Sequence, residues 1–542
     1  MVDSNSNLDV IERICGNNNE DEPDNYLWES DPNRSAIQQF YDGTNVFITG
    51  ASGFVGMALV EKLLRSCPGI KRLFLLMRPR KGKTPEERAT DMFLNHIFEP
   101  LLVKYPNILD KVKIIHGDIQ QPNLGISSSD AELLKKEVNI VFHVAATVAF
   151  DEALRTAYLM NVVSLRSILE LAEAMADLKA FVHVSTAFCH VHLDTVKFEE
   201  KFYPCQYSEE EVEALLNSAD DYTIATLLSH FLAKAPTTYT LTKAIAEDVV
   251  RRKMDKLPVA IYRPAIVMNT YEEPIRGWNL TFQGAGALLL GIGLGILRVI
   301  LVHPEKNADL VPVDKCACAL TVLPWYIHTS RRSKDKPDPI YHHVSTPITW
   351  KEASEHMIHH IKVNKFASKF QVWVLIAHFE TNKMLFHIKA FFYHLLPLPI
   401  FALAERLQGQ RPRLGKVYRK MVRLVNVLSN FTLENKFFED KNILRVWSSM
   451  SEMDQCIFPL DATKVDWFRY LNFMTPGYGV YVMNETWEDV LRSRIIYRKM
   501  EIADTCLHYS IRGLQLFVLY KIGVCLFNMF TNYFEIQMGR LY

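Results

Sequence analysis

One short segment restricts the fold of this chain more than any other: three closely spaced glycines that follow an apolar run. The run 45–49 has the composition of a buried strand, and the segment 50–56, GASGFVG, leads into a helical pattern at 55–64. Glycines at this spacing let the backbone turn tightly, and the helix N-terminus then offers free N–H groups to an anion. This context predicts a dinucleotide-binding turn rather than an ordinary glycine-rich loop. We expect the pyrophosphate to be held by Gly50, Ser52, Gly53, Phe54, Val55 and Gly56.

Further apolar runs of strand length follow the glycine turn, and helical patterns separate most of them. The runs occupy residues 73–77, 112–115, 140–144, 180–184 and 259–262. Continuous apolar strands that alternate with helices are typical of a parallel sheet covered on both faces. The sequence therefore predicts an α/β fold, a doubly wound parallel sheet of the Rossmann type.

The chain divides into four parts that differ in composition and in the pattern of apolar residues. Residues 40–345 carry the strand–helix alternation, and residues 350–500 are predicted to form a mainly helical second domain. Residues 1–36 are acidic and Asn-rich, which predicts a disordered tail. The fourth part is a hydrophobic segment at 511–537. Lysine plus arginine equals aspartate plus glutamate at 61 each, which argues against nucleic acid as a partner.

Two apolar stretches raise the question of a membrane. Residues 281–297 are uncharged but short, and their five glycines favour a loop or pocket wall inside the folded domain over a membrane span. Residues 514–530 carry Lys521 near their middle, which costs about 2.5–3.5 kcal/mol of insertion free energy. This cost favours a shallow or hairpin membrane anchor over a clean span, with a buried amphipathic helix as the alternative.

Basic residues stand where the second strand would meet the adenosine ribose. An acidic residue there would bind the 2′-hydroxyl of NAD, but the chain has Arg78, followed by Arg80 and Lys81. This favours NADPH, with Arg78 on the 2′-phosphate; a solvated basic loop is the alternative. Asp118 follows the third strand and is placed to accept from the adenine amino group. Small residues after the fourth strand, Ala145 and Ala146, would let the cofactor lie against the sheet.

The candidate catalytic residues are Tyr239 and Lys243, with Ser185 and Thr186 upstream. Four residues apart on a helix, the tyrosine and lysine share a face. The lysine cation is expected to lower the phenol pKa, and Thr186 to donate its hydroxyl to a substrate oxygen. Together they would protonate a carbonyl oxygen as hydride arrives. Pro264, after the sixth run, fits a turn that packs on the nicotinamide.

The histidines and cysteines give no metal pattern. His356 and His360 are one helical turn apart, but no H-E-x-x-H pattern occurs and no carboxylate ligand is obvious. The nine cysteines, scattered and odd in number, show neither a zinc-site nor a disulfide spacing. We expect no metal site and reduced thiols.

These residues carry a resemblance to a known family. The chain resembles the eukaryotic fatty acyl-CoA reductases, extended short-chain dehydrogenases/reductases (SDRs) that are abundant in insects. The matching phrases are VFITGASGFVGMALVEKLLRSCPGIKRLFLLMRPRKGKTPEER, VFHVAATVAFDEALR, FVHVSTAFCH, YTLTKAIAEDVV, VAIYRPAIV and DLVPVD, with QRPRLGKVYRKM in the second domain. The chain departs from the family pattern at Ala149 and Leu294, where the family often has a basic residue, and at Phe188, where it often has tyrosine.

The resemblance implies the reaction and the partners. It implies NADPH-dependent reduction of long-chain fatty acyl-CoA to a primary alcohol through an aldehyde, with release of CoA, at a cytosolic membrane face: endoplasmic reticulum, lipid droplet or, alternatively, peroxisome. Residues 205–235 would form an insertion over the site and, with 281–297, line an acyl tunnel. Alternatives are release of the aldehyde, a two-electron reductase of steroid or sugar-nucleotide type, and a non-catalytic lipid-binding protein of the same fold.

Overall fold

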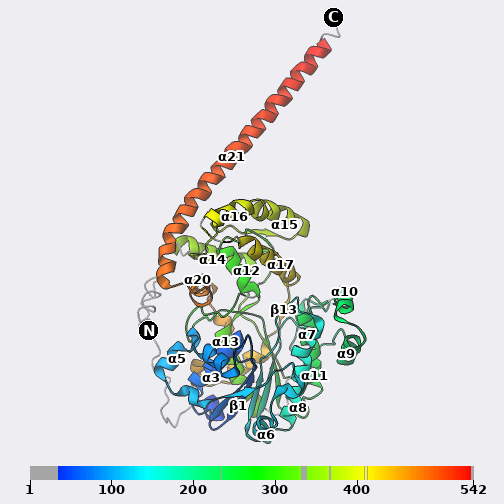
Figure 1. Ribbon diagram of the computed structural model, residues 1–542, viewed down its shortest axis with the longest axis vertical. Coiled ribbons are helices and arrows are strands. Elements are labelled where there is room, and N and C mark those ends of the chain that lie inside the picture. The colour runs from blue at the N-terminus through cyan, green and yellow to red at the C-terminus, as the bar shows by residue number, and fades with distance from the viewer. Residues whose placement is uncertain are drawn as a thin grey trace.

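The centre of the molecule is a seven-stranded parallel sheet (Figure 1). The computed structural model describes residues 35–232, 235–282, 284–330, 339–364, 368–407, 409, 411 and 413–538. The strands, in spatial order, are β11 (Ile340–His343), β7 (Val259–Pro264), β5 (Ala180–Val184), β4 (Ile140–His143), β1 (Asn45–Thr49), β2 (Arg72–Met77) and β3 (Val112–His116). All neighbours pair in parallel. This confirms the predicted α/β doubly wound fold.

Helices cover both faces of the sheet, as its continuous apolar strands require. On one face, Val46 and Ile48 of β1 pack in a core with α3 (Phe54–Ser66) and α13 (Val313–Ser330). On the other face, Phe47 of β1 packs with α6 (Ser128–Glu137), α8 (Ser164–Glu173) and α11 (Thr238–Arg251). The remaining helices and turns of this part are α2 (Ala36–Tyr41), α4 (Pro85–Phe93), η1 (His96–Phe98), α5 (Glu99–Lys104), η2 (Ile108–Lys111), η3 (Pro122–Gly125), α7 (Leu154–Tyr158), η4 (Leu159–Val163), α9 (Glu209–Ser218) and α10 (Asp221–Leu232).

A second, mainly helical core lies beyond the strand ends. It is built from α12 (Gly284–Gly293), α14 (Trp350–Asn364), α17 (Leu414–Thr432), α20 (Trp467–Gly477) and the start of α21 (Trp487–Met538). The other elements of the later chain are α15 (Lys383–Ala390), η5 (Phe391–Leu395), α16 (Leu398–Leu407), α18 (Lys441–Ser449), α19 (Glu452–Ile457), η6 (Ala462–Lys464) and η7 (Tyr478–Val482). Three short parallel pairs join β8 (Ile266–Met268) to β10 (Leu310–Pro312), β9 (Val299–Leu301) to β12 (His378–Glu380), and β6 (Lys197–Phe198) to β13 (Phe437–Phe438).

The central part of the glycine-rich stretch 281–297 forms a buried helix, α12, rather than a loop. In α12, a β-carbon on Gly286 would lie 1.9 Å from the Tyr478 hydroxyl, and one on Gly291 would lie 3.0 Å from Leu297. The glycines therefore let neighbouring side chains approach the helix backbone. The prediction that this stretch belongs to the folded body is confirmed, but its helical conformation was missed.

Both cores draw on residues from either side of position 345. Residues of β8, α12 and β9 belong to the second core, while Ile443, Val446 and Phe458 pack in the core around the central sheet. Strand β11 was not predicted, and α18 packs against it. The predicted acidic tail, 1–36, lies outside the described residues except for Ser35 and Ala36.

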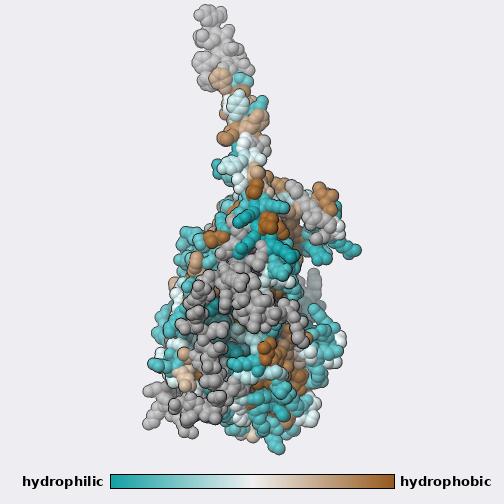
Figure 2. Space-filling view, turned by 90° about the vertical axis from the view of Figure 1, so that its left-hand side faces the viewer, coloured by the Kyte–Doolittle hydropathy of each residue, from teal (hydrophilic) through white to brown (hydrophobic). Residues whose placement is uncertain are grey.

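The C-terminal helix α21 projects away from the body as one long rod (Figures 1 and 2). In the described residues it is the one helix long and apolar enough to cross a membrane, with a mean hydropathy of 1.4 over its most apolar 18 residues. None of that window is buried. The alternative of a buried C-terminal helix is therefore wrong, and the segment is continuous rather than a hairpin.

Candidate active site

The glycine turn forms a cradle in which side chains do not fit. Gly50 has φ +75°, and a β-carbon there would lie 2.6 Å from the Ala145 backbone nitrogen. A β-carbon on Gly56 would lie 2.2 Å from the Gly50 carbonyl oxygen. Gly53 caps the N-terminus of α3, so that the helix begins at Phe54 and points its free N–H groups into the turn. This geometry fits a pyrophosphate.

Positive charge gathers beside the cradle, where the adenosine ribose of a dinucleotide would lie. Arg78, after β2, donates to Asp118 at 3.1 Å and to Gln120 at 3.3 Å. From α4, the Arg88 guanidinium donates to the Ser52 hydroxyl at 3.1 Å and to the Arg78 carbonyl. Partial burial and, after it, the neighbouring charges of Arg80 and Arg78 lower the Arg88 pKa. Arg88 was missed because it lies eleven residues after the end of β2, on a helix whose orientation the sequence does not determine.

The catalytic candidates meet at the end of β5. The Tyr239 hydroxyl lies close enough to the Thr186 side chain for that hydroxyl to lower the phenol pKa, and the Lys243 ammonium donates to the Val184 carbonyl at 2.7 Å. Ser185 is buried next to them, and its N–H donates to the Tyr262 carbonyl at 2.8 Å. The structure therefore brings together all four residues that the sequence singled out.

The protonation of this group differs from the prediction. Burial raises the pKa of Tyr239 well above its ordinary value, and the hydrogen bond with Thr186 opposes this rise only in part. Burial lowers the pKa of Lys243 to about 8. The expected lowering of the phenol pKa by Lys243 is not among these effects, and the ammonium donates instead to the Val184 carbonyl. The tyrosine is a protonated acid.

A buried charged network lies under the catalytic helix. Glu247, one turn after Lys243, receives hydrogen bonds from Arg263 at 2.9 and 2.5 Å and contacts His190 Nε2 at 3.2 Å. The Cys189 thiol donates to the same carboxylate at 3.3 Å. Cysteine, histidine and glutamate also lie close enough to share a metal ion. The arginine already neutralises the carboxylate, so the network is better explained as an ion pair that fixes α11.

A π-helical turn places a polar residue behind the site. In η4, Asn161 Oδ1 accepts from the Thr147 N–H at 2.9 Å, and Asn161 Nδ2 donates to the Thr242 hydroxyl at 2.9 Å. These bonds tie the loop after β4, which includes Ala145 and Ala146, to the catalytic helix. Asn161 could not be predicted from the sequence, because a π-helical turn has no distinctive sequence pattern.

A cavity of about 540 Å³ opens beside the catalytic helix. Phe150 lines it, and its ring lies 5.8 Å from the Tyr239 ring and 5.7 Å from Phe431 on α17. Thr237, the N-cap of α11, forms the near wall, and α17 forms the far wall. Helices α9 and α10, predicted to cover the site, lie at the edge of the molecule by α7 (Figure 1), and none of their described residues lines the cavity.

Two sequence expectations differ in detail. Pro264 ends strand β7 instead of forming a turn, and its carbonyl accepts from the Ala187 N–H at 3.0 Å. The side chains of α12 fill the second core, and no described residue of 281–297 lines the cavity beside Tyr239, so their part in an acyl tunnel stays a prediction. The residues that line the cavity belong instead to the loop after β4, to the start of α11 and to α17.

The arrangement supports hydride transfer to a carbonyl. A nicotinamide nucleotide, held by the glycine cradle, would supply the hydride. Thr186 and Tyr239 offer hydroxyl donors to one oxygen atom, and the protonated phenol can pass a proton to it. Lys243, at the base of the site, can donate to a ribose hydroxyl. Fold and site together define a short-chain dehydrogenase/reductase of the extended type.

Comparisons with known proteins identify the family within this class. Two family models, both described as male sterility protein, match residues 48–320 and 393–485. The chain is 34% identical to fatty acyl-CoA reductase wat of Drosophila melanogaster, over 88% of this chain and 90% of the relative. It is 32% identical to fatty acyl-CoA reductase 1 of Xenopus laevis, over 93% and 96%, and 30% identical to the Homo sapiens protein of that name, over the same shares. The chain belongs to the fatty acyl-CoA reductase family.

Solved structures agree on the fold. The terminal reductase domain of the myxalamid biosynthetic pathway superposes with a TM-score of 0.54 at 18% identity, covering 81% of this chain and 90% of that domain. A reductase domain of a Mycobacterium tuberculosis non-ribosomal peptide synthetase also gives 0.54 at 18% identity, over 82% and 92%. At this identity the likeness extends to the fold alone.

Proposed function

We propose that this chain reduces long-chain fatty acyl-CoA to a primary fatty alcohol with NADPH. Membership of the reductase family over nearly the whole chain, with both family modules present, supports the substrate. The observation that carries the chemistry is the meeting of Tyr239, Thr186 and Lys243 at one strand end. A two-electron reductase of steroid or sugar-nucleotide type would not require the second module.

The reaction takes two reductions at the same site. In the first, hydride adds to the thioester carbonyl carbon and Tyr239 donates a proton to the oxygen, which gives a thiohemiacetal. Its carbon–sulfur bond breaks, the thiol of CoA leaves with a proton, and an aldehyde remains. In the second, hydride and a proton convert the aldehyde to the alcohol. No protein nucleophile is needed, because hydride itself attacks the carbonyl.

The choice of NADPH over NADH rests on charge. Arg78 and Arg88 converge beside the cradle. Arg80 adds a third guanidinium, close enough for its charge to lower the Arg88 pKa. Guanidinium groups bind phosphate oxygens in forked geometry. Arg78 already pairs with Asp118, and a 2′-phosphate would offer the remaining positive charge an anionic partner that a bare ribose hydroxyl cannot offer.

The test uses detergent-solubilised full-length protein, as wild type and Tyr239→Phe. Palmitoyl-CoA and NADPH are supplied, and free thiol, NADPH loss and lipid product are followed together. The proposal expects two NADPH consumed per thiol, hexadecanol as product, and loss of turnover in the variant with NADPH binding retained. One NADPH per thiol with aldehyde would mean that the aldehyde is released. No thiol release from any acyl-CoA would refute the proposal in favour of the other reductase types or of a non-catalytic lipid binder.

We further propose that the chain is anchored to a membrane with its catalytic part in the cytosol, at the endoplasmic reticulum or a lipid droplet. The apolar, unburied α21 supports this. Helices α15 and α16, with the turn η5 and the short link between them, lie near the point where α21 leaves the body (Figure 1) and form a second apolar surface. Its exposed residues include Met384, Ile388, Phe391, Phe392, Leu396, Leu403 and Leu407. Exposed apolar surface of this kind marks an interaction site.

A fluorescence experiment tests this orientation. A label is placed on Phe392→Cys in a full-length chain whose exposed cysteines are serine, and the protein is reconstituted in vesicles with brominated lipids. Quenching is expected for this label and not for one on Tyr222→Cys, an exposed position on α10. Equal quenching at both positions, or none at Phe392→Cys, would contradict a lipid contact of α15 and α16.

A further inference from the structure

The cavity beside the catalytic helix has a charged wall that the reduction chemistry does not use. At about 540 Å³ it is within the usual range for small-molecule sites. One side of α17 lines it with Arg419, Val422, Arg423, Asn426, Val427 and Asn430. These positions recur every three or four residues, so they form one face of the helix. The opposite wall carries Phe150 and Thr237, next to the catalytic tyrosine.

The cations of α17 are largely without partners in the described part of the chain. The helix holds Lys416, Arg419, Lys420 and Arg423 and has no acidic residue. Within the described residues, Arg423 is the one of these four with an ion-pair partner, Asp151 at 3.9 Å, and both side chains are mostly exposed, at 77% and 63%. Such an exposed pair contributes little. The guanidinium groups are therefore available to an anion.

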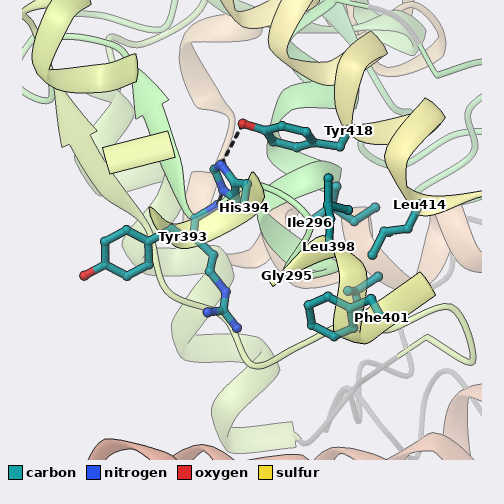
Figure 3. A pocket seen from close by; sticks show the side chains of 10 residues that line it. Gly295, Ile296, Tyr393, His394, Leu398, Phe401, Leu414 and Tyr418 are labelled. Atoms are coloured by element: carbon teal, nitrogen blue, oxygen red, sulfur yellow. Dashed lines mark hydrogen bonds between the residues drawn. The ribbon is translucent and has the colours of Figure 1, made fainter. Parts of the chain in front are cut away.

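The position of α17 relative to the catalytic tyrosine is fixed by aromatic contacts at one end and a polar anchor at the other. Phe431 contacts Phe150, which contacts Tyr239. Near the other end, Tyr418 is 3.1 Å from His394 Nδ1 at the edge of a small cavity (Figure 3). His394 Nε2 accepts from a backbone N–H at 2.8 Å, so Nδ1 is the donor to the tyrosine.

The spacing along α17 suits an extended thioester arm. Arg423 lies eight residues before Phe431 and Arg419 lies twelve before it, which places them about 12 and 18 Å along the helix from the aromatic contact. This span is comparable with the length of a pantetheine arm. Asn426 and Asn430, between the cations and the aromatic cluster, offer side-chain amides to the two amide groups of such an arm.

We propose that Arg419 and Arg423 bind the phosphate groups of the CoA portion of the substrate, so that the thioester arm runs along α17 to Tyr239. The inference rests on the proposed acyl-CoA reduction and adds the site that recognises CoA. Guanidinium forks match the diphosphate and the 3′-phosphate in charge and geometry. The module after residue 345 thereby supplies the recognition of CoA, and the sheet supplies the hydride chemistry.

The test compares two acyl donors on full-length protein in neutral detergent. Palmitoyl-CoA carries the phosphates, and S-palmitoyl-N-acetylcysteamine has the same thioester without them. In Arg419→Gln/Arg423→Gln, KM for palmitoyl-CoA should rise roughly tenfold for each lost charged hydrogen-bonding group, with kcat and the turnover of the truncated donor unchanged. Lys420→Gln, which removes a cation of α17 outside the cavity lining, is the control and should change KM little.

Binding of CoA itself separates this inference from the proposed function. CoA should raise the thermal unfolding temperature of the wild type and not that of the double variant, and this readout needs no turnover. An unchanged KM for palmitoyl-CoA, an equal rise for both donors, or an equal effect of Lys420→Gln would overturn the proposal. The same holds if the double variant loses activity only on vesicles with anionic lipids, because the arginines would then bind lipid headgroups.

Discussion

The buried pair of Glu247 and Arg263 allows the sharpest test of how the catalytic helix is held. Both side chains are 1% exposed, and two hydrogen bonds join them. Glu247→Gln leaves the guanidinium charged and without its counter-ion in the core. Removal of one partner from a buried pair costs about 3–5 kcal/mol, so we expect a large fall in the thermal unfolding temperature of the detergent-solubilised protein.

Two further variants isolate the cause of that fall. Glu210→Gln is the same change in an exposed pair with Arg252, and it should leave the unfolding temperature unchanged. Glu247→Gln/Arg263→Met removes both charges and should recover most of the loss, since an apolar replacement of a buried pair is often neutral. An unfolding temperature of Glu247→Gln equal to that of Glu210→Gln would refute the reasoning.

The same substitution has a second, functional readout. The carboxylate of Glu247 raises the Lys243 pKa, which burial lowers to about 8. Without the carboxylate, the lysine pKa falls further. A lysine is charged below its pKa, so activity that needs the ammonium is lost as pH rises through this value. The alkaline limb of kcat/KM for NADPH should therefore move to lower pH in Glu247→Gln, an effect that instability alone would not produce.

Three other predictions follow from single contacts. Gly56→Ala places a β-carbon 2.2 Å from the Gly50 carbonyl oxygen and should destabilise by about 1–3 kcal/mol and weaken NADPH binding, whereas Gly415→Ala, with no atom near its β-carbon, should not; equal unfolding temperatures would contradict the cradle. In the wild type, kcat/KM for NADPH should decline above about pH 8 with the charge of Lys243, and a profile flat to pH 10 would remove the lysine from the reaction. Arg88→Gln should raise KM for NADPH roughly tenfold and leave KM for NADH unchanged, and parallel changes for both cofactors would mean that Arg88 does not read the 2′-phosphate.

The sequence predicted elements correctly where a residue type has a single physical reason to occur at its position. The six apolar runs became six strands because a two-sided cover demands apolar residues on both faces. The seventh strand, β11, was missed because its side chains include His342 and His343. Both are buried and neutral, since burial lowers their pKa values to about 3 and about 4, and their ring nitrogens are bonded to the Glu439 and Leu460 carbonyls.

The residues of the candidate site also divide into those that could be predicted from the sequence and those that could not. Tyr239, Lys243 and Thr186 could be predicted, because proton transfer restricts the residue types and the strand and helix fix their order. Arg88 and Asn161 could not, because each acts through a bond to a residue distant in sequence. The basic residues of α17 are visible in the sequence, but their place in the fold could not be predicted. Only the folded chain places that helix opposite the catalytic tyrosine.

The protonation of the catalytic pair matches the direction of the proposed reaction. Reduction of a carbonyl consumes one proton with each hydride, so the enzyme must hold an acid and not a base at the oxygen. Burial keeps Tyr239 protonated in the free enzyme, and the low Lys243 pKa keeps the ammonium a ready donor near neutral pH. Oxidation of an alcohol would need the phenolate, which the buried site disfavours. A protonated Tyr239 is the form that the reduction requires, and the proton that it gives up must be replaced before the aldehyde takes the second hydride.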